Sequence, residues 1–315
     1  MNYLNKGILV AAVAGILFLI ESCSTGPDYI REGAKKYNEK DYSGSINDFN
    51  KEIENNSSSD SAYLMKGKAE NLLGKFREAV NDFSKSIDLN NTFDALFNRG
   101  IAYLSLNEND SAFSDFSSAI QLKPTSDTAY YCRGYVLGLL HKRQEAIADY
   151  DKAILINPRY QTAYVNRGNV KSDIEDYDGA LEDYSISLDL NPHDISAYFD
   201  RGYTLKLLGD NEQAVSDFNK VLEAAPDNKD VYYLRGEARM DLKKYKDAIE
   251  DFTSIIKLNH KDGKAYFFRG MSYLKIKNKK QACTDLKRSG ELGYVDANAE
   301  LTKNCKPPKK LKNKR

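Results

Sequence analysis

The chain has 315 residues, of which 29% are charged and 41% are hydrophobic. Its 46 basic and 46 acidic residues give a formal net charge of zero, so the composition predicts no long-range attraction to nucleic acid or to an anionic membrane surface. Only three histidines and four cysteines are present, which leaves little material for a metal site. The length would suggest about two globular domains, unless the chain is built from repeats.

The first 22 residues have the pattern of an export signal. A 14-residue apolar run, Gly7–Ile20, suits the central region of a signal peptide and is short for a membrane span. It leads into the letters I-E-S-C, which resemble the lipobox of bacterial lipoproteins, although Glu21 departs from that pattern. The resemblance implies a signal peptide over residues 1–22, lipidation of Cys23, and a short tether over residues 23–26. An ordinary secretory signal and an uncleaved anchor with an incidental cysteine are the alternatives.

From about residue 27 the sequence repeats with a period of 34 residues. The stretch Ala129–Pro158 recurs as Ala163–Pro192 with the same landmarks, A-Y, R-G, A, D-Y and N-P. Eight glycines anchor the repeats, and the step between them is 34 residues except for one step of 33. The anchors are Gly33, Gly67, Gly100, Gly134, Gly168, Gly202, Gly236 and Gly270. A period of about 20 to 50 residues is typical of a solenoid or an array.

Within each repeat, apolar residues recur at helical spacing and predict two antiparallel helices. The glycine on the first helix and an alanine on the second let the two backbones approach closely. We expect the aromatic residue after that alanine to fill the space between one hairpin and the next, and a proline to stop the second helix. The sequence therefore predicts an all-α solenoid over residues 27–290, in which each repeat buries its apolar face against its neighbours.

These landmarks resemble the tetratricopeptide repeat (TPR). The signature positions of the fourth repeat hold Tyr130, Gly134, Ala146, Tyr150, Ala153 and Pro158. One difference is systematic, because an arginine stands in six repeats where the family has a leucine before the glycine. The resemblance covers most of the chain and implies a TPR superhelix of about eight helix–turn–helix repeats with a C-terminal capping helix.

The arginine before the glycine and an aspartate on the second helix form a periodic series, for which Arg133 with Asp149 and Arg167 with Asp183 are examples. An arginine side chain leans toward the start of its own helix, which is the aspartate end of an antiparallel partner. We expect a structural ion pair, either between Arg133 and Asp149 or between Arg133 and Asp115 of the preceding repeat. Such a pair would favour register more than stability.

The resemblance also implies a concave groove lined by the first helix of each repeat. The candidate residues lie three before and one after the glycine: Phe97, Tyr131, Tyr135, Val165, Asn169, Phe199, Tyr203, Tyr233 and Phe267. An aromatic surface of this kind can supply binding hot spots. The alternative is that several of the rings pack against the neighbouring repeat. The clamp of lysines and asparagines that some family members use for chaperone carboxylates is absent, so we do not expect a chaperone adaptor.

The C-terminal segment is expected to close the solenoid with a capping helix within residues 291–305. Cys283 and Cys305 fall at facing positions of the resulting antiparallel hairpin. An exported protein could bridge them, and a disulfide and two free thiols are the two possibilities. The last segment, residues 306–315, has six basic residues and two prolines and is predicted to be disordered.

No motif predicts catalysis. The sequence lacks a glycine-rich phosphate loop, a zinc-protease helix motif and a nucleophile elbow, and its three histidines fall in different repeats. We therefore expect no enzyme activity, no metal and no cofactor.

The predicted function is a non-enzymatic scaffold of the bacterial cell envelope, held by a lipid on Cys23 in the outer membrane and facing the periplasm or the surface. Its groove would bind another envelope protein or a peptide, and no nucleic acid. The alternatives are a soluble exported TPR protein that binds a non-protein ligand such as a glycan, and an accessory subunit of an envelope enzyme complex.

Overall fold

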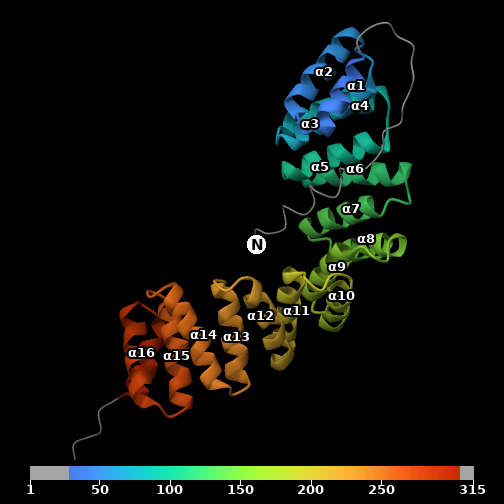
Figure 1. The fold of residues 1–315 in the computed structure, drawn as a ribbon. Coiled ribbons are helices and arrows are strands. Elements are labelled where there is room, and N and C mark those ends of the chain that lie inside the picture. The colour runs from blue at the N-terminus through green and yellow to red at the C-terminus, as the bar shows by residue number, and fades with distance from the viewer. Residues whose placement is uncertain (1–27, 306–315) are drawn as a thin grey trace, which may run out of the picture. The chain divides into compact units, whose positions relative to one another are not determined.

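The computed structural model of the chain describes residues 28–305 and shows an all-helical protein (Figure 1). These residues form seventeen helices and no strand. The helices up to residue 91 are α1 (Tyr29–Asn38), α2 (Tyr42–Asn55), α3 (Asp60–Leu72) and α4 (Phe76–Leu89). The later helices are α5 (Phe93–Ser105), α6 (Asn109–Leu122), α7 (Asp127–Leu139), α8 (Arg143–Ile156), α9 (Gln161–Asp173), α10 (Tyr177–Leu190), α11 (Ile195–Leu208), α12 (Asn211–Ala224), α13 (Lys229–Asp241), α14 (Tyr245–Leu258), α15 (Gly263–Lys275), α16 (Lys279–Glu291) and α17 (Val295–Asn304).

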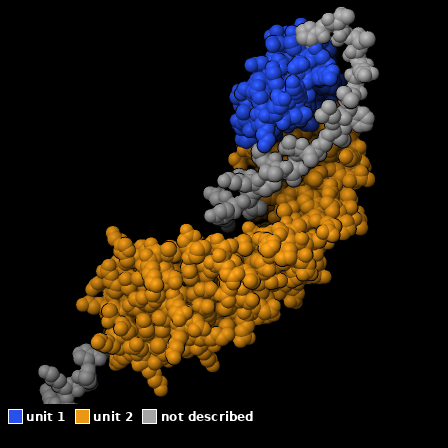
Figure 2. All heavy atoms as spheres, viewed as in Figure 1, with its two compact units in different colours: residues 1–91 blue, residues 92–315 orange. Residues whose placement is uncertain are grey.

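The helices fall into two compact units (Figure 2). Unit 1 ends at Asn91 and contains α1–α4, and unit 2 begins at Thr92 and contains α5–α17. Within each unit consecutive helices pair as hairpins, so that α1 packs on α2 and α5 on α6, and the second helix of one hairpin packs on the first helix of the next, as α6 does on α7. Unit 1 therefore holds two repeats and unit 2 holds six repeats and α17, which confirms the predicted solenoid of about eight repeats with a cap.

The helices begin and turn at residues whose chemistry suits those positions. Ahead of α7, the Ser126 hydroxyl accepts a hydrogen bond from the backbone N–H of Ala129 at 3.2 Å, which satisfies a donor that the helix leaves free. Between the two helices of a hairpin, one residue adopts a left-handed conformation. Gly74 and Gly209 do so without strain, whereas His141 holds a φ of 60° in the fourth hairpin.

The repeating glycine of every hairpin lies against the side chain sixteen residues later. The ring of Tyr184 approaches Gly168 so closely that a Cβ on the glycine would meet three ring carbons at 2.8–3.2 Å. In the last hairpin Leu286 takes the place of the ring, opposite Gly270. We expected the rings to fill the space between hairpins, but each ring packs first on the glycine of its own hairpin, because the missing side chain leaves room there.

The arginine before the glycine binds the aspartate of its own hairpin. Nε and Nη2 of Arg133 donate to the two carboxylate oxygens of Asp149, both at 2.7 Å. Nε and Nη2 of Arg167 bind Asp183 in the same way at 2.9 and 2.5 Å. Of the two partners that the sequence left open for Arg133, the structure pairs it with Asp149 and not with Asp115. The planar guanidinium suits this two-point contact with a carboxylate.

The third nitrogen of the same arginine reaches the preceding hairpin. Nη1 of Arg133 donates to the Ser117 hydroxyl of α6 at 3.3 Å, while the guanidinium lies 5.7 Å from the centre of the Tyr130 ring. Similar Nη1 contacts join Arg167 to Asp151, Arg201 to Ser185, Arg235 to Asn219 and Arg269 to Thr253. A single side chain thus links the two helices of its own hairpin and the hairpin before it, which fixes the register of the stack.

Unit 1 departs from this arrangement in its second hairpin. Lys66 stands in the arginine position, and its Nζ lies 3.1 Å from a carboxylate oxygen of Asp82 and 3.9 Å from one of Glu70. Both carboxyl groups are buried. Burial raises the pKa of Glu70 to about 8, and the hydrogen bond and negative charge of Asp82 add to the effect. One lysine therefore lies near two carboxyl groups, and Glu70 retains its proton at neutral pH.

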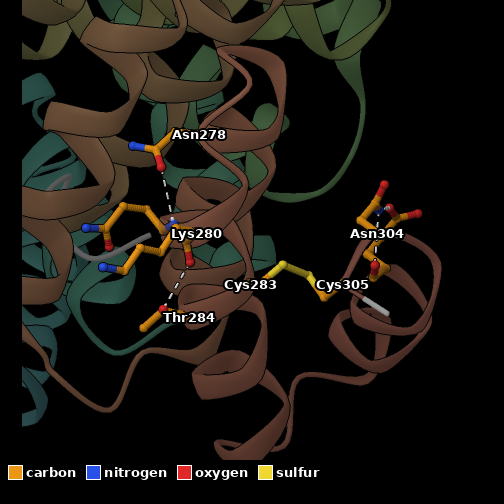
Figure 3. Close-up of a disulfide and its surroundings, with 8 residues drawn as sticks. Asn278, Lys280, Cys283, Thr284, Asn304 and Cys305 are labelled. Atoms are coloured by element: carbon orange, nitrogen blue, oxygen red, sulfur yellow. Dashed lines mark hydrogen bonds between the residues drawn. A yellow bond between two sulfur atoms is a disulfide. The ribbon is translucent and has the colours of Figure 1, made fainter. Parts of the chain in front are cut away.

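Helix α17 lies at the C-terminal end of unit 2 and packs on α16. A disulfide joins Cys283 of α16 to Cys305 just after α17, with 5.6 Å between the two Cα atoms (Figure 3). Tyr294, just before α17, packs on Phe267 of α15 with 5.0 Å between ring centres, and Ala297 is fully buried. The bridge anchors the far end of a ten-residue helix in which Ala297 is the buried residue.

The predicted signal peptide (residues 1–22), the tether with Cys23 (residues 23–26) and the basic segment (residues 306–315) lie outside the described residues. Between residues 28 and 305, no helix combines the length and the apolar character that a bilayer-spanning segment needs. The lipid anchor and the envelope location therefore remain predictions.

Candidate protein-binding surface

The first helices of neighbouring hairpins form a layer in unit 2. Helix α7 contacts α9, α9 contacts α11, and α11 contacts α13, while each packs its glycine side on the second helix of its own hairpin. Side chains one and five residues after the glycine are about one helical turn apart and point away from the glycine side. We call the surface that they form the first-helix face. Its members are Tyr135, Leu139, Asn169, Asp173, Tyr203, Leu207, Glu237 and Asp241.

Two helices of the first-helix face carry apolar patches. On α11, Tyr203 is 43% exposed and Leu207 is 50% exposed. On α7, Leu139 is 43% exposed and Tyr135 is half-buried. A tyrosine and a leucine four residues apart on one helix lie next to each other, so each pair forms one patch. These patches are unpartnered apolar surface of the kind that marks interaction sites.

The other two helices carry polar and acidic groups at the same positions. The Asp173 side chain at the end of α9 is 67% exposed, and it approaches Arg143 at 3.9 Å. On α13, Glu237 forms an ion pair with Lys206 of α11 at 3.2 Å, and Asp241 is exposed. The first-helix face therefore alternates between apolar and acidic from one hairpin to the next.

The predicted groove residues three before the glycine lie deeper. Phe97, Tyr131, Val165 and Tyr233 are buried, and Phe199 and Phe267 are partly buried. The Tyr131 ring lies 4.9 Å from that of Tyr160, just before α9, and its hydroxyl accepts a hydrogen bond from the Asn166 amide at 2.8 Å. The Tyr233 hydroxyl donates to Asp262 at 2.5 Å. Tyr131 and Tyr233 therefore contact the next hairpin, so for these two residues the alternative expectation, packing against the neighbouring repeat, applies.

The predicted residues one after the glycine reach the surface. Tyr203 is exposed, and Tyr135 and Asn169 are partly exposed. The Asn169 side-chain oxygen accepts a hydrogen bond from the Tyr184 hydroxyl at 2.7 Å, and its amide hydrogen-bonds the Asp200 carboxylate. Burial raises the pKa of Asp200 to about 6, although that hydrogen bond partly offsets the effect. The ring that packs on the glycine therefore also orients Asn169 at the surface.

Sequence reasoning missed the residues five after the glycine, which include the most exposed members of the first-helix face. Leu139, Asp173, Leu207 and Asp241 recur with the same period as the glycines. The register that identified the position one after the glycine could therefore have identified them. Asp200 has no such signal, because its burial depends on neighbouring helices.

Among residues 28–305, the candidate metal ligands lie apart and the free cysteine is buried. No group of three or more histidine, cysteine, aspartate or glutamate side chains between residues 28 and 305 is placed to hold a metal ion. Cys132 is buried, and burial raises the pKa of its thiol to about 12, which keeps it protonated and unreactive near neutral pH. What the first-helix face offers is apolar contact, hydrogen bonding and negative charge.

The hairpin repeat and the layer of first helices define an α-helical repeat protein of the solenoid class. Family models described as tetratricopeptide repeat match residues 64–127, 127–160, 174–239 and 229–262, which together span more than half of the chain. The protein belongs to the tetratricopeptide-repeat family. The fold is that of a protein-interaction scaffold, because stacked repeats create extended binding surfaces. No curated protein sequence matches the chain.

Solved structures show the same fold. A tetratricopeptide-repeat protein from Parabacteroides merdae ATCC 43184 aligns with a TM-score of 0.55 and 20% identity, covering 78% of this chain and 98% of that one. YrrB, described as a TPR protein with an unusual peptide-binding site, aligns with a TM-score of 0.52 and 20% identity over 61% of this chain and 97% of its own. MamA aligns with a TM-score of 0.50 and 27% identity over 53% of this chain and 92% of its own.

Proposed function

We propose that the protein is a non-enzymatic scaffold of the bacterial cell envelope, whose first-helix face binds a peptide or a segment of another envelope protein. A lipid on Cys23 would hold it at the membrane. The observation that carries the proposal is the exposed pair on α11, where Tyr203 and Leu207 are 43% and 50% exposed. A partner that covers them would remove two large apolar side chains from water, which favours association.

The scaffold itself supports this location for the site. Asp183 binds Arg167 inside their hairpin, Arg167 also binds Asp151 of the preceding hairpin, and Tyr184 is buried on the glycine. Tyr203 and Leu207 have no such structural task, because their side chains project from the layer of first helices. YrrB, which shares the fold and is described as having a peptide-binding site, supports a peptide as the ligand class.

The test is in-cell crosslinking from the first-helix face. A photoreactive residue replaces Tyr203, and the matched control replaces Leu155, which is 73% exposed on the second helix α8. We expect one dominant envelope protein to be trapped from position 203 and not from position 155. Equal trapping from both positions, or none from position 203, would contradict the proposal. A probe at Tyr131 is unsuitable because that side chain is buried.

The anchor is tested separately. Cells are fed a labelled fatty acid, and the full chain is compared with its Cys23→Ala variant. Label on the first and none on the second is expected for a lipoprotein. Absence of label on both proteins would favour an ordinary secretory signal or an uncleaved anchor. That result would not contradict the proposed binding surface.

A further inference from the structure

We infer that the first-helix face takes an extended, cationic peptide whose apolar side chains alternate with lysine or arginine. This inference rests on the proposed function and adds the chemical class of the ligand. It comes from two features of unit 2, which are the order of apolar and acidic patches along the face and the distribution of charge along the chain.

The order of patches follows the hairpins. The apolar pair Tyr135 and Leu139 on α7 is followed by Asn169 and Asp173 on α9. The apolar pair on α11 is followed by Glu237 and Asp241 on α13. A ligand that crosses these four helices meets apolar, acidic, apolar and acidic surface in turn. Its side chains must match that order, because a basic group over an apolar patch or an apolar group over a carboxylate is unfavourable.

The negative charge of the face is part of a larger local excess. Residues 161–241, from α9 to α13, contain 17 acidic and 8 basic residues, a net charge of −9 in a chain whose total is zero. Some of that charge is committed, since Glu237 lies 3.2 Å from Lys206 and 3.9 Å from Lys264. Asp241 has no ion pair among the described residues, and Asp173 has only the 3.9 Å approach of Arg143. A field of this sign attracts cationic ligands and raises their association rate.

The charge also changes sign at the next first helix, which limits the site. Helix α15 presents the exposed Lys275 at the position five after its glycine, and Lys264 at its start lies 3.9 Å from Glu237. A cationic ligand is therefore attracted over α9–α13 and repelled beyond α13. The site has a defined end, and four hairpins set its length.

The spacing of the helices predicts the spacing of the ligand's side chains. Packed helices lie about 8–10 Å apart, and an extended peptide rises about 3.3 Å per residue, so each hairpin spans about three ligand residues. Apolar anchors for α7 and α11 should then be about six residues apart, with a lysine or arginine midway and another beyond the second anchor. An extended ligand leaves its backbone N–H groups free, and the carboxylates of Asp173 and Asp241 can accept them.

The inference is tested with the full chain in detergent and fluorescent synthetic peptides, by anisotropy. One peptide has two leucines about six residues apart with lysines midway and beyond. Its twin has glutamates in place of the lysines, and a third has the same composition with the leucines adjacent. We expect the first to bind at least about tenfold more tightly than either of the others. Its affinity should fall as salt rises from about 50 to 300 mM.

Variants locate the site. Asp173→Asn with Asp241→Asn should weaken binding of the cationic peptide about two- to fivefold per charge, because both carboxylates are exposed and partly screened. Both residues end their helices, where a negative charge is unfavourable, so the changes do not threaten folding. Glu182→Gln, an exposed acid on the second helix α10, is the matched control and should leave affinity within about twofold.

Each other outcome overturns the inference. If the cationic and acidic peptides bind equally well, charge does not determine binding. If the peptide with adjacent leucines binds as well as the peptide with spaced leucines, spacing does not determine binding. If deleting residues 306–315 raises affinity about tenfold or more, the occupant is the chain's own basic segment and not a separate peptide. If a protein is trapped from position 203 but the peptide results contradict the inference, the proposed function stands and only the ligand class is wrong. If no protein is trapped and no peptide binds, the proposed function and the inference are both wrong.

Discussion

Replacing Gly168 with alanine should destabilise the third hairpin of unit 2, even though alanine favours a helix. The added Cβ would meet three carbons of the Tyr184 ring at 2.8–3.2 Å, where ordinary contact begins near 3.4 Å. The ring would have to retreat by about 0.6 Å. The ring is 1% exposed and its hydroxyl is hydrogen-bonded to Asn169, so the surrounding packing leaves no space for this shift. Overpacking costs about 1–3 kcal/mol, and the gain in helix propensity returns at most about 1 kcal/mol.

We expect a net loss of about 1–2 kcal/mol and a Tm lower by roughly 2–6 °C. The matched control is Gly138→Ala on α7, where the nearest atom to a new Cβ lies 4.0 Å away on Val170. That variant should be neutral or more stable by up to about 1 kcal/mol. Thermal melts give the global effect, and hydrogen exchange over α9 and α10 shows whether the loss is local, as expected when each hairpin contacts only its neighbours.

A double-mutant cycle isolates the contact. Tyr184→Leu copies the pairing of Leu286 with Gly270 in the last hairpin, where the leucine meets the glycine without a ring. Gly168→Ala should therefore cost less in the Tyr184→Leu background than in the wild type. A Gly168→Ala variant as stable as wild type, or additive energies in the cycle, would refute the claim that the ring requires the glycine.

Four further substitutions test the ion pairs, a buried carboxyl group and the cap, each by urea unfolding or hydrogen exchange. Arg201→Leu leaves the buried Asp217 with no other cation among the described residues and should cost about 2–4 kcal/mol of stability. Arg167→Leu should cost less, because Lys171 remains 2.9 Å from Asp183. Equal losses of stability would contradict this. Because the folded-state pKa of Glu70 is raised from 4.5 to about 8, the stability that its proton supports is present below pH 4.5 and is lost as pH rises to 8. Glu70→Gln should therefore be about 2–4 kcal/mol more stable than wild type at pH 8.5 and little different at pH 4.5. A stability difference that does not change with pH would refute this explanation. Cys305→Ser removes a disulfide whose cysteines are separated by 22 residues, and it should lower the protection of α17 against hydrogen exchange by about 2–3 kcal/mol. Reduced wild-type protein should show the same loss. Unchanged protection in the variant and in the reduced wild type would show that the cap needs no bridge.

The scaffold was predictable because each of its rules acts within a single repeat. The spacing from Gly168 to Tyr184 is the same in every hairpin, and a glycine in mid-helix signals close approach wherever it recurs. The partner of Arg133 was not predictable, because Asp149 and Asp115 both stand at a suitable height on a neighbouring helix. The packing of the hairpins decides it, and the guanidinium is long enough to serve both hairpins through different nitrogens.

The binding surface was only half predictable, for a reason of geometry. Positions three before and one after the glycine are about one helical turn apart, so the sequence treats them as one stripe. In the stack, the earlier position meets the incoming hairpin, as Tyr131 meets Tyr160, and the later one does not, as for Tyr203. That difference depends on where the next hairpin docks, which no pattern within one helix contains.

The division between scaffold and surface explains where specificity can reside. The aspartate fifteen residues after the glycine is present in all eight repeats, and in unit 2 it is buried in an ion pair of its own hairpin. One and five residues after the glycine the identities change from hairpin to hairpin, from tyrosine and leucine on α11 to glutamate and aspartate on α13. Exchanging these exposed side chains costs little stability, because surface substitutions are usually within about 0.5 kcal/mol. Replacing Tyr203 and Leu207 by the pair found on α13 should therefore leave the melting temperature nearly unchanged and abolish the apolar patch. Loss of co-purification of the trapped partner at unchanged stability is then the signature of a surface that exists for a partner.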